Sequence, residues 1–254
     1  MRAQFEKDGY ITWPFPDEIR KAMVAHIDSY IRSLSKAQGS LEEIVQTIPD
    51  LVWQKEMNRC FRMFPDSLAK QALEWAHGSF SKPFGKSVCA VNVVLPQEVA
   101  ENHVLTEDHL AIYWRCVRPG KPDAGRPHRD ANFWDLEFSE GYNPKIPFPF
   151  NYLKDCMKIW IPLSGCYPDT TLRVIPRSHQ MEIPTIVEQT DYGRRPSIHP
   201  NWLQEYQASF MSPPELSQGS CLLFDMNLVH MGPRHNHSTL RISAEFNFIT
   251  KEAL

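Results

Sequence analysis

Residues 241–249 read RISAEFNFI, and this stretch decides the fold. Polar side chains stand at positions 241, 243, 245 and 247, and apolar ones stand at 242, 244, 246 and 248. Successive side chains of a β-strand point to opposite faces of a sheet, so the stretch predicts a strand with one polar and one apolar face. The apolar face needs a cover, and the polar face is expected to line a cavity.

The sequence changes in character at Pro83. After it, runs rich in β-branched and aromatic residues recur between proline-bearing loops, at residues 87–95, 111–117, 157–163, 171–175 and 220–224. Such runs predict short strands, and no helical segments alternate with them. The pattern therefore predicts a mainly β fold, a jelly roll or double-stranded β-helix, in place of alternating βα units.

The first eighty residues have helical periodicity. Ile19, Met23 and Ile27 recur at helical spacing after Pro16, and a second segment of this kind begins at Pro65. We expect one domain over residues 1–254, in which helices of residues 1–82 pack on the outer sheet of a jelly-roll core at residues 83–254. No linker or internal repeat divides the chain.

The composition narrows the range of partners. A formal charge of −3 gives no overall attraction to nucleic acid or to an anionic membrane. The N-terminus lacks an apolar signal core, and no stretch approaches the roughly 18 apolar residues of a membrane span. Six cysteines without CxxC spacing predict free thiols in a reducing compartment. We expect a cytoplasmic protein that acts on a small molecule; its oligomeric state is left open.

The triplet His128-Arg129-Asp130 and the distant His230 form the candidate metal site. In an extended strand, His128 and Asp130 project from the same face and Arg129 points away. Such a triplet arises easily by chance in a chain with 10 histidines and 30 acidic residues, but a later histidine in strand-like sequence makes chance a poor explanation. Two imidazoles and one carboxylate form the facial triad of non-haem Fe(II) and dioxygen chemistry.

Arg241 follows the last ligand and shares a strand face with Ser243. Its guanidinium can give two parallel hydrogen bonds to a carboxylate, and Ser243 can give a third. The pair therefore indicates an acidic co-substrate. The alternatives are an exposed strand arginine at position 241 and a hydrogen-bonded core histidine at position 230.

These residues lie in motifs that resemble the phytanoyl-CoA dioxygenase family of Fe(II)/2-oxoglutarate oxygenases, which includes the ectoine hydroxylases. In chain order, the similar stretches are residues 5–10 (FEKDGY), 127–130 (PHRD), 159–163 (IWIPL), 172–179 (LRVIPRSH) and 219–225 (GSCLLFD). His230 follows, and Arg241 stands eleven positions later, a typical separation. One departure is Arg177, which stands where the family usually has glycine, the residue that a left-handed turn favours.

The resemblance implies an Fe(II)/2-oxoglutarate-dependent dioxygenase that uses O2 to hydroxylate a C–H bond of a small metabolite, with release of succinate and CO2. It implies that iron binds to His128, Asp130 and His230. The cofactor-binding residues that it implies are Arg241, Ser243 and Trp160.

Other reactions and other functions stay open. Asp130 favours hydroxylation, because related halogenases give its position to chloride, whereas desaturation and epoxidation leave no motif. A cupin-like dioxygenase without a keto acid is disfavoured by Arg241 and Ser243. A non-catalytic metal-binding jelly-roll protein is disfavoured by the intact ligand set.

Candidate substrate contacts lie on both sides of the metal motif. Tyr113 and Arg115 share one strand face, and Arg115 could meet an anionic group or lie on the surface. Trp134 matches an aromatic residue of ectoine-hydroxylase-like members, with core packing as the alternative. Residues 138–151, rich in proline, glycine and aromatic residues, are predicted to form a lid.

Three further histidines are not expected to bind the metal. His179 matches a recurrent family position for which a structural loop role is expected. His235 and His237 lie in a turn-rich segment, which favours solvent exposure.

Overall fold

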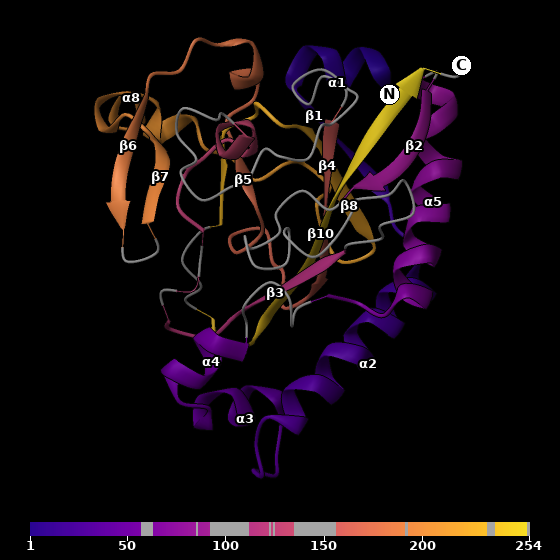
Figure 1. The fold of residues 1–254 in the computed structure, drawn as a ribbon, viewed down its shortest axis with the longest axis vertical. Coiled ribbons are helices and arrows are strands. Elements are labelled where there is room, and N and C mark those ends of the chain that lie inside the picture. Colours follow the sequence, from indigo (N-terminus) through magenta and orange to yellow (C-terminus); the bar gives the residue numbers. More distant parts are fainter. Residues whose placement is uncertain are drawn as a thin grey trace.

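The alternating stretch forms the centre of the largest sheet. In the computed structural model, which describes residues 1–56, 63–84, 86–91, 112–121, 123, 125–134, 156–190, 193–232 and 237–252, it is strand β10 (Arg241–Glu252). The strand order is β1-β8-β4-β10-β2, and β3 also pairs with β10 (Figure 1). The other bounds are β1 (Tyr10–Pro14), β2 (Lys86–Val91), β3 (Tyr113–Val117), β4 (Cys156–Ser164) and β8 (Ser220–Asp225).

Smaller antiparallel units complete the β-structure. Strand β5 (Arg173–Val174) pairs with β9 (His230–Met231), and β6 (Thr185–Thr190) forms a hairpin with β7 (Gly193–Ile198). Figure 1 shows this hairpin at the side of the molecule away from α5 (Asp66–Phe84). The antiparallel sheets and the N-terminal helices confirm the predicted jelly-roll class. Strands were predicted at β2, β3, β4, β5, β8 and β10. Residues 92–95 of the first predicted strand lie outside the described residues.

The N-terminal helices cover the apolar face of the large sheet. Ile242, Ala244 and Phe246 of β10 are each no more than 2% exposed and share one core with the helices. The helix side of this core includes Met23, Ile27 and Ile31 of α2 (Asp17–Ser33), with further residues from α3 (Leu41–Thr47), α4 (Asp50–Glu56) and α5. Apolar burial of this extent is the main stabilisation of the sheet, and it confirms the predicted cover.

The sequence prediction missed one strand inside the helical region. Residues 10–14 form β1, which pairs with β8 in the register Tyr10↔Phe224 to Pro14↔Ser220. Helix α1 (Arg2–Asp8) precedes it and ends at Gly9, which has a φ of 81°. The remaining helical segments are α8 (Pro200–Tyr206) and the short 3-10 turns η2 (Asp130–Trp134), η3 (Ser178–Gln180) and η4 (Gln207–Ser209).

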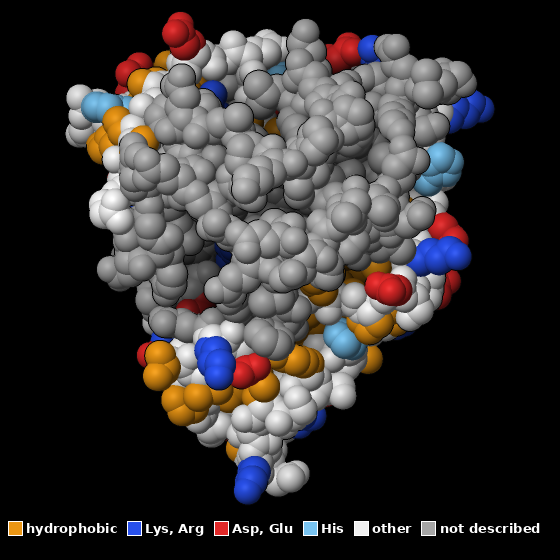
Figure 2. Space-filling model, in the orientation of Figure 1, with side chains coloured by type: hydrophobic (Ala, Val, Ile, Leu, Met, Phe, Trp, Pro, Cys, Tyr) orange, Lys and Arg blue, Asp and Glu red, His pale blue; other side chains and the backbone are white. Residues whose placement is uncertain are grey.

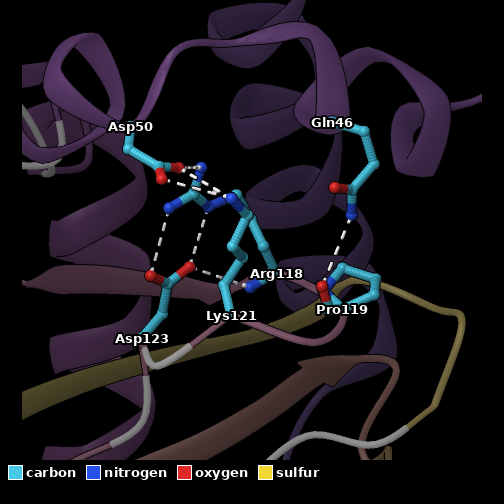
Figure 3. A network of polar contacts seen from close by, with 6 residues as sticks. All are labelled: Gln46, Asp50, Arg118, Pro119, Lys121 and Asp123. Atoms are coloured by element: carbon cyan, nitrogen blue, oxygen red, sulfur yellow. Dashed lines mark hydrogen bonds and ion pairs between the residues drawn. The ribbon is translucent and has the colours of Figure 1, made fainter.

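A network of hydrogen bonds and ion pairs connects the helical cover to the end of β3 (Figure 3). The Arg118 side chain, only 3% exposed, lies 2.9 Å from Asp123 and 2.8 Å from Asp50 of α4. Its guanidinium also lies 4.7 Å above the Trp53 ring, and Lys121 lies 3.1 Å from Asp50. A buried guanidinium needs such partners, so the network fixes α4 against the strand that carries the candidate substrate residues.

The described surface carries both charge signs. Figure 2 shows both Lys and Arg side chains and Asp and Glu side chains on the described part of that face. Within the described ranges, no helix combines the length and the apolar composition needed to cross a bilayer. The described free cysteines are Cys116, Cys166 and Cys221, and all three are buried.

Candidate metal centre

Backbone pairing brings the two candidate histidine ligands together. His128 and His230 form an antiparallel bridge, in which each backbone N–H donates to the other residue's carbonyl at 3.0 Å. Residues paired in this way point their side chains to the same side, and the two ring centroids are 4.3 Å apart. Two segments a hundred residues apart in the chain thus present their imidazoles at one point.

The geometry of the metal motif corrects one prediction. Asp130 does not lie on an extended strand with His128, because it begins the 3-10 turn η2. Its carboxylate nevertheless reaches the histidines: Oδ1 lies 3.4 Å from Nε2 of His128 and 3.7 Å from Nε2 of His230. The three ligand atoms all lie within 4.8 Å of one another, and no other group of this kind occurs among the described residues.

The hydrogen bonds of both imidazoles leave the correct nitrogen for a metal. Nδ1 of His128 lies 2.6 Å from the carbonyl oxygen of Arg126, and Nδ1 of His230 lies 2.9 Å from that of Leu228. A carbonyl only accepts, so Nδ1 carries the proton and Nε2 keeps its lone pair. Metal-binding histidines commonly have such a partner, which fixes the tautomer and the ring orientation.

The electrostatics also suit a cation. Burial, together with His128 nearby, lowers the pKa of His230 to about 4, so its imidazole is neutral at pH 7. Burial alone would raise the pKa of Asp130, but Lys158 and the two histidines outweigh it and hold this pKa well below its usual value. The site therefore offers two imidazoles and one carboxylate, which is the ligand set of the facial triad.

Arg241 and Ser243 lie on the polar face of β10. Both are nearly buried, at 4% and 5% exposure, and the guanidinium Nη1 of Arg241 donates to the carbonyl of Thr170 at 2.6 Å. Burial, with Arg115 as a further cause, lowers the pKa of Arg241 to about 10, so its charge gains from an anionic partner. His230 and Arg241 lie on β9 and β10, which belong to different sheets.

The predicted substrate and cofactor residues share the polar face of the large sheet. Ser243 pairs with Arg115 and Glu245 pairs with Tyr113, which places all four on one face. Trp160 of β4 pairs with Glu245, is 5% exposed and packs in the inner apolar cluster. The Trp134 side chain and the predicted lid at residues 138–151 lie outside the described residues.

Lys158 is the site residue that the sequence prediction missed. It lies on β4 in phase with Trp160, is 9% exposed, and places Nζ 3.0 Å from Oδ2 of Asp130 and 3.8 Å from Glu245. A lysine within the apolar run 156–163 was the available signal, because a charged residue inside such a strand requires a buried partner.

His179 and His237 have partners other than the three candidate ligands. Nε2 of His179 lies 3.2 Å from the carbonyl oxygen of Glu6, and its ring lies against Gly9, in agreement with a structural role. His237 is partly exposed and pairs with the exposed Asp169 at 2.8 Å. His235 lies outside the described residues.

Comparison with known proteins agrees with this geometry. The family model described as phytanoyl-CoA dioxygenase (PhyH) matches residues 49–242, a range that contains all three candidate ligands and Arg241. The chain belongs to the phytanoyl-CoA dioxygenase family. A search of proteins with curated functions gave no match.

Two solved structures resemble this phytanoyl-CoA dioxygenase family member in fold. One is the non-heme alpha ketoglutarate dependent carbocyclase SnoK from nogalamycin biosynthesis, with 12% identity, coverage of 99% of this chain and 85% of that chain, and a TM-score of 0.52. The other is EctD from S. alaskensis with bound Fe, with 15% identity, 97% and 74% coverage, and a TM-score of 0.50. At these identities the likeness shows the fold, and it agrees with the jelly roll described above.

Proposed function

We propose that this protein is an Fe(II)- and 2-oxoglutarate-dependent dioxygenase that hydroxylates a C–H bond of a small metabolite. The observation that carries the proposal is the convergence of Nε2 of His128, Nε2 of His230 and Oδ1 of Asp130. Membership of the phytanoyl-CoA dioxygenase family supports the same class of chemistry.

The residues present fit the iron and the keto acid. Each of the two histidines has Nδ1 held by a backbone carbonyl, which leaves Nε2 as the nitrogen that can bind a metal. Iron, 2-oxoglutarate and O2 together supply the oxidising chemistry, with release of succinate and CO2. The task of the chain is to hold, orient and enclose the reactants.

Arg241 and Ser243 are the residues we assign to the far carboxylate of 2-oxoglutarate. A buried guanidinium gains more from an anion than an exposed one does, since little water competes for its donors. Ser243 adds a hydroxyl donor from the same strand face. Trp160, also on this face, supplies an apolar wall that limits the access of water.

We assign the substrate to the side of the metal centre where Arg115 of β3 lies. The Arg115 side chain is partly buried, and among the described residues it makes no hydrogen bond or ion pair. Nη1 of Arg115 lies 3.2 Å from the position that a Cβ at Gly125 would occupy. Gly125 stands three residues before His128. We therefore propose that Arg115 binds an anionic group of the substrate, with Tyr113 and Trp134 as further contacts.

We propose that residues 1–254 form one oxygenase domain, in which residues 1–82 are the helical cover and residues 83–254 are the jelly-roll core. The single strand β10 carries residues assigned to the co-substrate on one face and residues of the helical core on the other. The helical cover and the site therefore share one structural element.

The test of function is formation of succinate by the purified, iron-loaded protein with a panel of small carboxylated metabolites. We expect His230→Ala to lose Fe(II) binding, measured by anaerobic calorimetry, together with succinate formation. His237→Ala is the matched control, because its imidazole pairs with the exposed Asp169 away from the three ligands. Wild-type Fe(II) affinity and activity in His230→Ala would refute the proposal.

A further inference from the structure

We infer that Lys158 is a positioning residue that holds one oxygen of Asp130 away from the metal. This inference rests on the proposed metal centre. Its basis is the unequal surroundings of the two carboxylate oxygens. Oδ1 faces both imidazoles, at 3.4 and 3.7 Å from their Nε2 atoms, whereas Oδ2 lies 3.0 Å from Nζ of Lys158.

The arrangement dictates how the carboxylate is used. A carboxylate can bind a cation through one oxygen or through both. With Lys158 on Oδ2, only Oδ1 is available where the three ligand atoms meet. Asp130 would then hold a bound metal through one oxygen, which would leave the open positions of the facial triad for the keto acid and O2.

The position of Lys158 is built into the fold. Its side chain is 11% exposed and comes from β4, a central strand that pairs with both β8 and β10. A lysine so buried stays charged only with anionic partners nearby. Glu245 is the second partner, at 3.8 Å from Nζ. Nζ of Lys158 therefore lies between the carboxylates of Asp130 and Glu245.

Removal of the ammonium has a specific consequence. In Lys158→Met the apolar volume of the side chain is largely kept, and Oδ2 of Asp130 loses its partner. The carboxylate is then able to turn and use both oxygens on the cation. We expect metal affinity within about threefold of wild type, because no ligand is lost and a repelling charge is removed. We expect 2-oxoglutarate to bind at least about tenfold more weakly, which corresponds to about 1.4 kcal/mol.

The experiment compares wild type, Lys158→Met, Lys158→Arg and the control Lys121→Met. Anaerobic calorimetry gives the affinity for Fe(II), and a second titration gives the affinity of the Fe(II)-loaded protein for 2-oxoglutarate. The absorption spectrum of the Co(II)-loaded protein reports the coordination number without any turnover. Lys121 is the matched control because its ammonium pairs with the exposed Asp50 in the network at the end of β3.

The expected result for Lys158→Met is a selective loss of 2-oxoglutarate affinity. Lys158→Met keeps its affinity for Fe(II), binds 2-oxoglutarate more weakly and has a changed Co(II) spectrum. Lys158→Arg restores the 2-oxoglutarate affinity and the spectrum, because it keeps a cation beside Oδ2. Lys121→Met resembles wild type. An unchanged 2-oxoglutarate affinity in Lys158→Met overturns the inference. So does a parallel loss of Fe(II), 2-oxoglutarate and melting temperature that Lys158→Arg fails to restore, since that pattern indicates a general structural role. Wild-type protein that binds no Fe(II) contradicts the proposed function itself.

Discussion

Gly165, directly after β4, provides a quantitative test of how the backbone positions Arg241. Its φ is +62°, in the left-handed region, and a Cβ at this position would lie 2.1 Å from the Leu240 carbonyl oxygen and 3.2 Å from Cα of Arg241. The same loop supplies the Thr170 carbonyl that accepts from the Arg241 guanidinium. Gly165→Ala therefore forces the start of β10 outward, at the residue assigned to 2-oxoglutarate.

The expected loss of stability in Gly165→Ala has two contributions. A left-handed conformation costs a residue with Cβ about 1–2 kcal/mol. The contact with backbone atoms, which cannot rotate away, adds about 1–3 kcal/mol. The expected loss of about 2–5 kcal/mol lowers the melting temperature by about 10 °C for a chain of this size. A shift of about 1 Å also takes the guanidinium out of hydrogen-bond range, so 2-oxoglutarate affinity should fall at least about tenfold.

Gly120→Ala is the matched control. Gly120 also has a left-handed φ, of +68°, but a Cβ there meets nothing within 4 Å. It should lose only the conformational contribution of about 1–2 kcal/mol and keep its affinity for 2-oxoglutarate. Differential scanning fluorimetry and anaerobic calorimetry measure the two quantities. Equal melting temperatures for the two variants, with unchanged 2-oxoglutarate affinity in Gly165→Ala, would refute the reasoning.

Substitutions of three arginines, Arg241, Arg177 and Arg118, give further predictions. Arg241→Ala should lose about 2–5 kcal/mol of 2-oxoglutarate binding free energy, which is roughly a 30-fold loss of affinity or more. Arg241→Lys should also bind 2-oxoglutarate poorly, because an ammonium lacks the planar fork of a guanidinium. Wild-type affinity in calorimetry on the metal-loaded variants would contradict this role of Arg241. Arg177→Gly should raise the melting temperature by about 2 °C, since Arg177 has a φ of 67°. Arg173→Gly, on the regular strand β5, should lower the melting temperature. A decrease in both variants argues against backbone strain at Arg177. Arg118→Leu should lower the melting temperature more than Lys121→Ala does, because Arg118 is buried and Lys121 is partly exposed; equal effects would exclude a fastening role.

The features that the sequence predicted correctly are those with a local signal. Strict alternation along β10 separates Ile242 and Phe246, which pack under the helices, from Ser243 and Glu245 on the polar face. The types of the three candidate ligands were also visible, because a facial triad needs particular residue types, although Asp130 reaches the histidines from the turn η2 and not from an extended strand. Arg177 was also recognisable, and its φ of 67° agrees with the left-handed turn that favours glycine.

The features that were missed depend on contacts between distant segments. Strand β1 lies among helices in the sequence and is extended only because it pairs with β8. Strand β7 includes Arg194, Arg195 and Pro196, so no apolar alternation marks it. Lys158 finds Asp130 and Glu245 only in the folded sheet. No local pattern carries such information, because it arises from the register of the strands.

The central place of β10 has a consequence for the order in which the protein can fold. This strand is made after every other strand described here, yet it pairs with β2, β3 and β4. A nascent chain that has not reached residue 241 therefore has these strands without their shared partner, and their edges are exposed to other chains. Contacts between segments so far apart slow folding. During synthesis, the co-substrate residues and the sheet that carries them should thus form together, in one late step.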